Sequence, residues 1–131
     1  MTLAEAPMIT PKKALEYIDE SNAPVLDMMI QFDTQEADCL FMDFNHIPFN
    51  LRKLKRAYSN WQNGLEGRGW NMLYIENHDH PRMVSRYGSE KYPTESAKTL
   101  CAMYMFLKGT PFVYQGQEIG MSNWYPNDPA M

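Results

Sequence analysis

Short apolar runs alternate with stretches of helical periodicity along the chain, and this order restricts the fold more than any other feature. The three clearest runs are largely apolar and bounded by Pro, Gly or Asn: VLDMMIQF, WNMLYIEN and TPFVYQG, at residues 25–32, 70–77 and 110–116. Runs of this kind are typical of strands that are covered on both faces. Residues 2–4 are a shorter candidate strand.

The stretches between these runs predict helices. Residues 51–65 carry one apolar stripe, and residues 94–107 repeat the pattern. Residues 11–18 form a shorter candidate, with Thr10 as the expected N-cap and Pro11 in the first turn. Strands that alternate with helices, over connections long enough for crossovers, predict an α/β fold with a parallel sheet. The stripe of the longest candidate consists of Leu51, Leu54, Ala57, Tyr58, Trp61 and Leu65.

The length of 131 residues suffices for one ordinary domain with an apolar core. Residues 33–50 and 122–131 are expected to be irregular, and the chain stops without a closing helix. Both ends therefore look truncated. We expect residues 1–131 to form a single fragment of one domain.

The charge pattern restricts the partners. The net charge is −4, and the 12 Lys and Arg residues are scattered, so the basic patch that nucleic acids or anionic membranes require is missing. The aromatic share of 13% suits a surface that stacks on sugars, although core packing explains the aromatic residues equally well. Two cysteines form no disulfide framework, and neither a secretion signal nor an apolar run of bilayer length is present. We expect a cytoplasmic protein with a small neutral ligand.

Polar side chains follow the predicted strands where parallel α/β folds place functional groups. Asn77, His78 and Asp79 follow one strand, Glu5 follows another, and the segment 115–118 follows a third. If Glu5 and Asp79 share one pocket, they can serve glycoside hydrolysis, which needs an acid for the leaving oxygen and a carboxylate to stabilise positive charge.

Two other interpretations of the segment after residue 77 stay open. In an extended backbone His78 and His80 face the same side and could bind one metal ion, but the only other histidine is His46, and we expect no metal site. The segment could also be a polar loop whose side chains cap the next segment.

Four segments together resemble the α-amylase-type glycoside hydrolases, and in particular the α-glucosidase branch with oligo-1,6-glucosidases, glucan-1,6-α-glucosidases and trehalose-6-phosphate hydrolases. YIENHDHPRMVSRYG resembles the segment at the seventh strand of that family, and GTPFVYQGQEIGMSN the eighth strand and its loop. LKRAYSNWQNGLEGRGWN is similar to the sixth helix and the start of the seventh strand, and MTLAEA to the fifth strand. The resemblance implies an α/β fold that is part of a (β/α)8 TIM barrel, namely strands five to eight with the helices between them.

The resemblance also implies roles for particular residues. Glu5 would be the catalytic acid and base, and Asp79 would bind the sugar hydroxyls and stabilise the transition state. His78 would hydrogen-bond the same sugar, and Arg82 would support the pocket wall as a substrate-binding residue. For Arg82 and Arg86 a structural ion pair is the alternative. No organic cofactor is implied.

The implied function is hydrolysis of α-glucosidic bonds in short gluco-oligosaccharides with retention. The family's nucleophile lies in an Arg-x-Asp segment at the fourth strand, which this sequence lacks, so the chain alone is expected to be inactive. His80 and Gln117 depart from the residues usual in the family. A sugar isomerase or transglucosidase of the same branch is one alternative, and a non-catalytic relative or fragment is another. Open barrel edges would favour self-association.

Overall fold

The computed structural model describes residues 1–39 and 47–125. Within them, four short strands and four α-helices follow one another, with two 3₁₀ turns, η1 (Asp33–Glu36) and η2 (Gln117–Ile119). The strands and helices in chain order are β1 (Leu3–Glu5), α1 (Pro11–Ile18), β2 (Met28–Ile30), α2 (Leu51–Leu65), β3 (Met72–Leu73), α3 (Met83–Tyr87), α4 (Pro93–Met105) and β4 (Thr110–Pro111).

The strands pair in parallel, as the alternation predicts. β1 pairs with β2, where Leu3 lies opposite Met28 and Glu5 opposite Ile30, and β3 pairs with β4. The regular ladders are shorter than the apolar runs, and Pro111 contributes to this because it has no amide hydrogen to donate.

The expectation of one continuous sheet is wrong for the described residues, in which the ladders form two separate pairs. β2 and β3 lie against each other, and the Tyr74 hydroxyl bridges their segments, while the Tyr58 hydroxyl joins α2 to the β3 segment. The Tyr74 hydroxyl donates to the carbonyl oxygen of Gln31 at 2.6 Å, and the Tyr58 hydroxyl donates to the carbonyl oxygen of Tyr74 at 3.1 Å. Burial raises the pKa of both tyrosines, so the hydroxyls keep their protons and remain donors.

β2 and β3 are largely buried on both faces, since successive side chains point to opposite sides, whereas β1 and β4 are partly exposed. Met29 packs with α1 and α2, and Leu73 packs with α2, α3 and α4. The alternate residues form a separate inner cluster on the face away from the helices, consisting of Met28, Met72 and Tyr74 with Ile30 and Phe112 beside them.

Helices α1 and α2 have the predicted bounds. The side chain of Thr10 caps α1 by accepting from the amide of Lys13 at 3.3 Å, and Asn50 caps α2 by accepting from the amide of Lys53 at 3.0 Å. Leu51 is 54% exposed, so the apolar stripe of α2 begins one turn later than predicted, at Leu54. The first turn of α2 lies beyond the packed core.

Helix α4 and the segments expected to be irregular differ from the prediction. α4 begins at Pro93 and ends at Met105 instead of covering 94–107, because proline suits the first helical position, whose amide lacks a partner in the helix. The turn η1 forms in a segment expected to be irregular, and the helix α3 forms where no element was predicted. Residues 40–46, with His46, and residues 126–131 lie outside the described residues.

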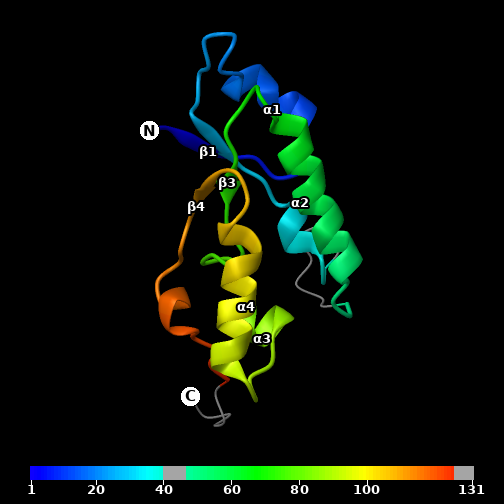
Figure 1. The fold of residues 1–131 in the computed structure, drawn as a ribbon, viewed down its shortest axis with the longest axis vertical. Helices are drawn as coiled ribbons and strands as arrows, with labels where there is room; N and C mark the ends of the chain where they lie inside the picture. Colours follow the sequence, from blue (N-terminus) through cyan, green and yellow to red (C-terminus); the bar gives the residue numbers. More distant parts are fainter. Residues whose placement is uncertain (40–46, 126–131) are drawn as a thin grey trace.

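Helix α1 packs on α2 at one end of the molecule, and α3 packs on α4 toward the other (Figure 1). Gly64 permits the close contact between α1 and α2. A Cβ atom at Gly64 would lie 2.5 Å from the Cβ of Pro11, at the start of α1. A buried tryptophan of α2 contacts η1 as well, since the Trp61 indole donates to Asp33 at 2.8 Å.

A buried ion pair joins α3 to the segment after η1. The Arg86 guanidinium donates to both carboxylate oxygens of Asp38, at 2.5 and 2.8 Å, and to the side-chain oxygen of Gln35 at 2.8 Å. Only 2% of the Arg86 side chain is exposed. The structural ion pair that the sequence left open for Arg86 is therefore observed.

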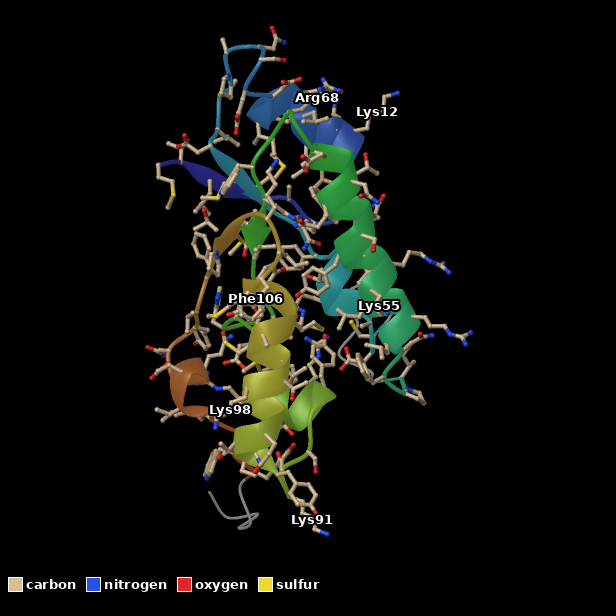
Figure 2. The ribbon with its side chains drawn as sticks, viewed as in Figure 1. Lys12, Lys55, Arg68, Lys91, Lys98 and Phe106 are labelled. Atoms are coloured by element: carbon tan, nitrogen blue, oxygen red, sulfur yellow. The ribbon has the colours of Figure 1, made fainter. Side chains whose placement is uncertain are left out.

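Basic side chains are spread along the long axis of the molecule. Figure 2 shows Lys12 and Arg68 at one end, Lys55 and Lys98 between, and Lys91 at the opposite end. In the described part of the chain, no helix is both long enough and apolar enough to span a bilayer.

We predict that Gly64→Ala destabilises the chain, although alanine is the better helix former. The new methyl group would overlap the rigid Pro11 ring, and such overpacking costs about 1–3 kcal/mol. Urea unfolding followed by circular dichroism measures the effect. The matched control is Asn60→Ala at an exposed position of the same helix, where a gain of about 0.5 kcal/mol is expected. Equal gains for both variants would contradict the close contact.

We predict that Asp19→Asn destabilises the chain at neutral pH and has little effect in acid. Hydrogen bonds from Ser21 and Arg68 lower the pKa of the Asp19 carboxyl group. A lowered folded-state pKa contributes stability above the unfolded value of about 3.9, and this contribution is lost as the pH falls through the folded value.

The measurement is the free energy of unfolding at about pH 7 and about pH 2. Glu16→Gln, which removes one partner of an exposed ion pair with Lys13, is the control and should change little at either pH. A loss of the same size for Asp19→Asn at both pH values would refute the role of this carboxylate.

Candidate functional site

A cavity of about 190 Å³ lies on the inner face of the strands and receives residues from each strand segment. Its lining includes Glu5, Ile30, Tyr74, His78, Phe112 and Tyr114. Apolar and aromatic walls with a few polar groups at one side are the usual features of a small-molecule site. The cavity is therefore the candidate functional site.

Glu5 reaches this cavity because of the register of β1. It lies opposite Ile30, on the same face as Leu3, whereas Ala4 between them lies on the other face. The Glu5 side chain is exposed, and within residues 1–39 and 47–125 no hydrogen bond to its carboxylate is found. The carboxyl group is thus accessible to a ligand.

Asn77 organises the loop that follows β3. Its side-chain oxygen accepts from the Asp79 amide at 3.2 Å and contacts the His80 ring nitrogen at 2.8 Å. Its amide nitrogen is 3.5 Å from the Asp79 carboxylate. Local side-chain to backbone bonds of this kind occur, as the polar-loop interpretation predicts.

Asp79 lies directly beside His78. The His78 Nε2 atom is 3.3 Å from the Asp79 carboxylate, and the two side chains are 70% and 43% exposed. His78 also lines the cavity with Glu5. Of the predicted site residues, the structure thus brings Glu5 and His78 to one cavity, whereas Asp79 is not among its lining residues and contacts His78.

The extended backbone assumed for a metal site does not occur, because residues 78 and 79 form a turn. His78 contacts Asp79, whereas His80 contacts Asn77 and packs near the Phe32 ring with centroids 6.2 Å apart. Among the described residues there is no group of three His, Cys, Asp or Glu side chains that could hold a metal ion.

Arg82 forms the second structural ion pair. Its guanidinium donates to the Glu76 carboxylate at 2.8 Å and to the carbonyl oxygen of Gln115 at 2.6 Å, and it lies 4.9 Å from the centroid of the Tyr114 ring. Arg82 therefore supports the cavity wall through Glu76 and Tyr114. The ion pair that the sequence left open is observed here too, and a contact between Arg82 and a substrate stays a prediction.

Glu76 was missed in the sequence analysis, although a signal exists. It ends the buried run WNMLYIE, and the Glu76 side chain is fully buried. A carboxylate at the end of a buried apolar strand requires compensating donors nearby. Arg82 and the backbone amide of Met83, which donates at 2.7 Å, are those donors.

Gln117 stabilises the segment after β4 through hydrogen bonds and is not among the residues that line the cavity. Its side-chain oxygen accepts from the Tyr114 amide at 3.1 Å, and its nitrogen donates to the Tyr104 hydroxyl at 2.7 Å. Burial raises the pKa of Tyr104 to about 12. An amide suits this position because it accepts and donates at once.

Comparison with known proteins agrees with these observations. The family model described as "Alpha amylase, catalytic domain" matches residues 1–131. The oligo-1,6-glucosidase of Parageobacillus thermoglucosidasius is 45% identical over 125 residues, which are 94% of this chain and 22% of that protein. The chain thus spans about a fifth of the length of the curated relatives it matches.

Solved structures give the same result. A mutant trehalose-6-phosphate hydrolase of Bacillus licheniformis, in complex with PNG, has a TM-score of 0.91 and 38% identity over 99% of this chain and 24% of its own. A mutant trehalulose synthase in complex with Tris has a TM-score of 0.83 and 28% identity over 96% of this chain and 23% of its own. The chain has the fold of a section of these α/β barrels, and it belongs to the α-amylase catalytic-domain family.

Proposed function

We propose that residues 1–131 are one fragment of a catalytic barrel, contributing strands five to eight of a cytoplasmic α-glucosidase. The protein would hydrolyse α-glucosidic bonds of short gluco-oligosaccharides with retention of configuration. One observation carries the proposal: Glu5 and His78, from the two separate strand pairs, line the same cavity, with Asp79 next to His78. The order of the strand segments and the relatives named above support it.

The two carboxyl groups have different roles in the proposed reaction. Glu5 protonates the glycosidic oxygen and later removes a proton from the attacking water. Asp79 binds sugar hydroxyls and stabilises the positive charge that develops at the sugar carbon, and His78 donates to the same sugar. Proton transfer and charge stabilisation by side chains suffice for this chemistry, so the proposal includes no cofactor.

The nucleophile must come from residues outside this chain. A retaining mechanism forms a covalent bond between a carboxylate and the sugar, and the family's Arg-x-Asp segment is missing from the sequence. The proposed activity therefore belongs to a longer protein that includes the fourth strand. We propose that the isolated chain is inactive.

A sugar isomerase or transglucosidase is the nearest alternative, because it shares the covalent intermediate and differs in what intercepts it. The similarity of this chain to a trehalulose synthase supports this alternative. A non-catalytic relative is a third candidate. Product analysis of the longer protein separates the three: free glucose, a rearranged or transferred sugar, or no product.

We predict that the isolated chain releases no p-nitrophenol from an aryl α-glucoside, whereas the version extended upstream through the fourth strand does. The reason is the missing nucleophile. Absorbance of released p-nitrophenol is the measurement. Turnover by the short chain would refute the proposal that the nucleophile lies outside residues 1–131. Inactivity of the extended chain would favour the non-catalytic relative.

We predict that Glu5→Gln and Asp79→Asn each lower kcat of the extended protein by about 1000-fold, since each removes a carboxyl group that the reaction uses. The control is Glu95→Gln, an exposed carboxylate in the first turn of α4, which should keep its activity. Azide, an anionic nucleophile that needs no general base, should restore Glu5→Gln by attacking the covalent intermediate with net retention, whereas it should not restore Asp79→Asn. Activity near that of the unmodified protein in either variant would remove that residue from the site.

We predict that the isolated chain self-associates through its sheet edges. Within the described residues β1 pairs only with β2 and β4 only with β3, and Leu3 and Val113 beside these edges are 36% and 48% exposed. Unpaired strand edges are templates for further pairing. Light scattering after gel filtration measures the mass. The matched test is Val113→Lys, which should reduce the mass, and a monomer at all concentrations would refute the prediction.

A further inference from the structure

The Glu76 carboxylate closes the base of the loop that carries the candidate site residues. One oxygen accepts from the Arg82 guanidinium at 2.8 Å and the other from the Met83 amide at 2.7 Å. Glu76 immediately precedes the loop 77–81, and Arg82 immediately follows it. The two ends of the loop are thus held together by one buried side chain.

Burial makes this contact a strong constraint on geometry. The Glu76 side chain is fully buried and the Arg82 side chain is 18% exposed. Removal of one partner from a buried pair leaves an uncompensated charge, which is strongly unfavourable. Alternative positions of residues 82 and 83 that lack these bonds are therefore disfavoured.

Arg82 extends the constraint to the neighbouring strand. Its guanidinium donates to the Gln115 carbonyl after β4, and its own backbone amide donates to the Asn123 side chain at 2.8 Å. Gly116 leaves room for the guanidinium, since a Cβ atom there would lie 3.3 Å from Nη2. The loops after β3 and β4 are connected through this one arginine.

Inside the closed loop the position of Asp79 follows from that of Asn77. Asn77 is directly bonded to Glu76 in the chain and accepts from the Asp79 amide. Asp79 in turn contacts His78, which lines the cavity with Glu5. Displacement of Glu76 or Arg82 would therefore move Asp79 relative to Glu5.

We propose that Glu76 is a positioning residue, which acts through Arg82 and the Met83 amide to hold Asp79 in the geometry that the transition state requires. This inference rests on the proposed glycosidase function. A carboxylate misplaced by about 1 Å loses about 100-fold in rate, because transition-state stabilisation depends on geometry more than substrate binding does.

The test uses the protein extended upstream through the fourth strand, with an aryl α-glucoside as the substrate. Glu76→Gln and Arg82→Met should each lower kcat by about 100-fold, with KM changed by less than about threefold. The double variant should lose less than the product of the two single losses, because both single variants remove the contact between Glu76 and Arg82. Arg82→Lys, which keeps a positive charge for Glu76, should retain more activity than Arg82→Met.

The matched control is Glu66→Gln, which breaks an exposed ion pair with Lys108; neither residue lines the cavity, and this variant should keep the unmodified kcat. The kcat of each variant is calculated per mole of folded protein, and near-ultraviolet circular dichroism measures the folded fraction. A Glu76→Gln variant with the unmodified kcat would overturn the proposal. Losses that add in the double variant would exclude action through Arg82.

Crystal structures of the unmodified protein and of Glu76→Gln give a readout independent of turnover. The proposal expects the Asp79 carboxylate to move by about 1 Å or more relative to Glu5. An unmoved Asp79 would overturn it. If the unmodified protein and Glu66→Gln are both inactive, the proposed function fails, and the position of Asp79 in the two crystal structures still decides this inference. If Glu76→Gln does not fold, Arg82→Lys and Arg82→Met provide the same comparison.

Discussion

The hydrogen bond between the Tyr74 hydroxyl and the carbonyl oxygen of Gln31 connects the two halves of this structure. Each half contains one parallel strand pair, α2 packs against both, and no backbone ladder joins the two pairs in the described residues. Tyr74 supplies a buried polar contact at 2.6 Å where an amide would otherwise be required. Since Glu5 belongs to one pair and His78 follows the other, the shared cavity depends on this junction.

Much of the architecture follows from periodicity. The helices α1 and α2 have the bounds that their caps and stripes predict, β2, β3 and β4 lie inside the three apolar runs, and β1 covers residues 3–5 where 2–4 was expected. The parallel direction follows from the long connections that contain α1 and α4. Glu5 and His78 line one cavity because side chains at the carboxyl ends of parallel strands share one edge of the sheet, whereas Asp79, the partner predicted for Glu5, is not among the lining residues.

The remaining features depend on contacts that no local pattern contains. Helix α3 has five residues, too few for an apolar repeat to be recognised, and it is held by the long-range pair of Arg86 with Asp38. The contact between the segments of β2 and β3 includes a hydrogen bond from Tyr74 to Gln31, which are 43 residues apart in the chain. The partner of Glu76 is six residues away in the chain, across a turn whose shape only the structure shows.

The hydrogen bonds of Asn77 have a thermodynamic consequence for any ligand of the cavity. They fix the backbone of the loop from Asn77 to His80 in the unliganded protein. The conformational entropy of this segment is therefore lost once, on folding, and not again at each encounter with a ligand. A weakly binding neutral molecule benefits from such preorganisation, because few strong contacts are available to offset the ordering of a disordered loop.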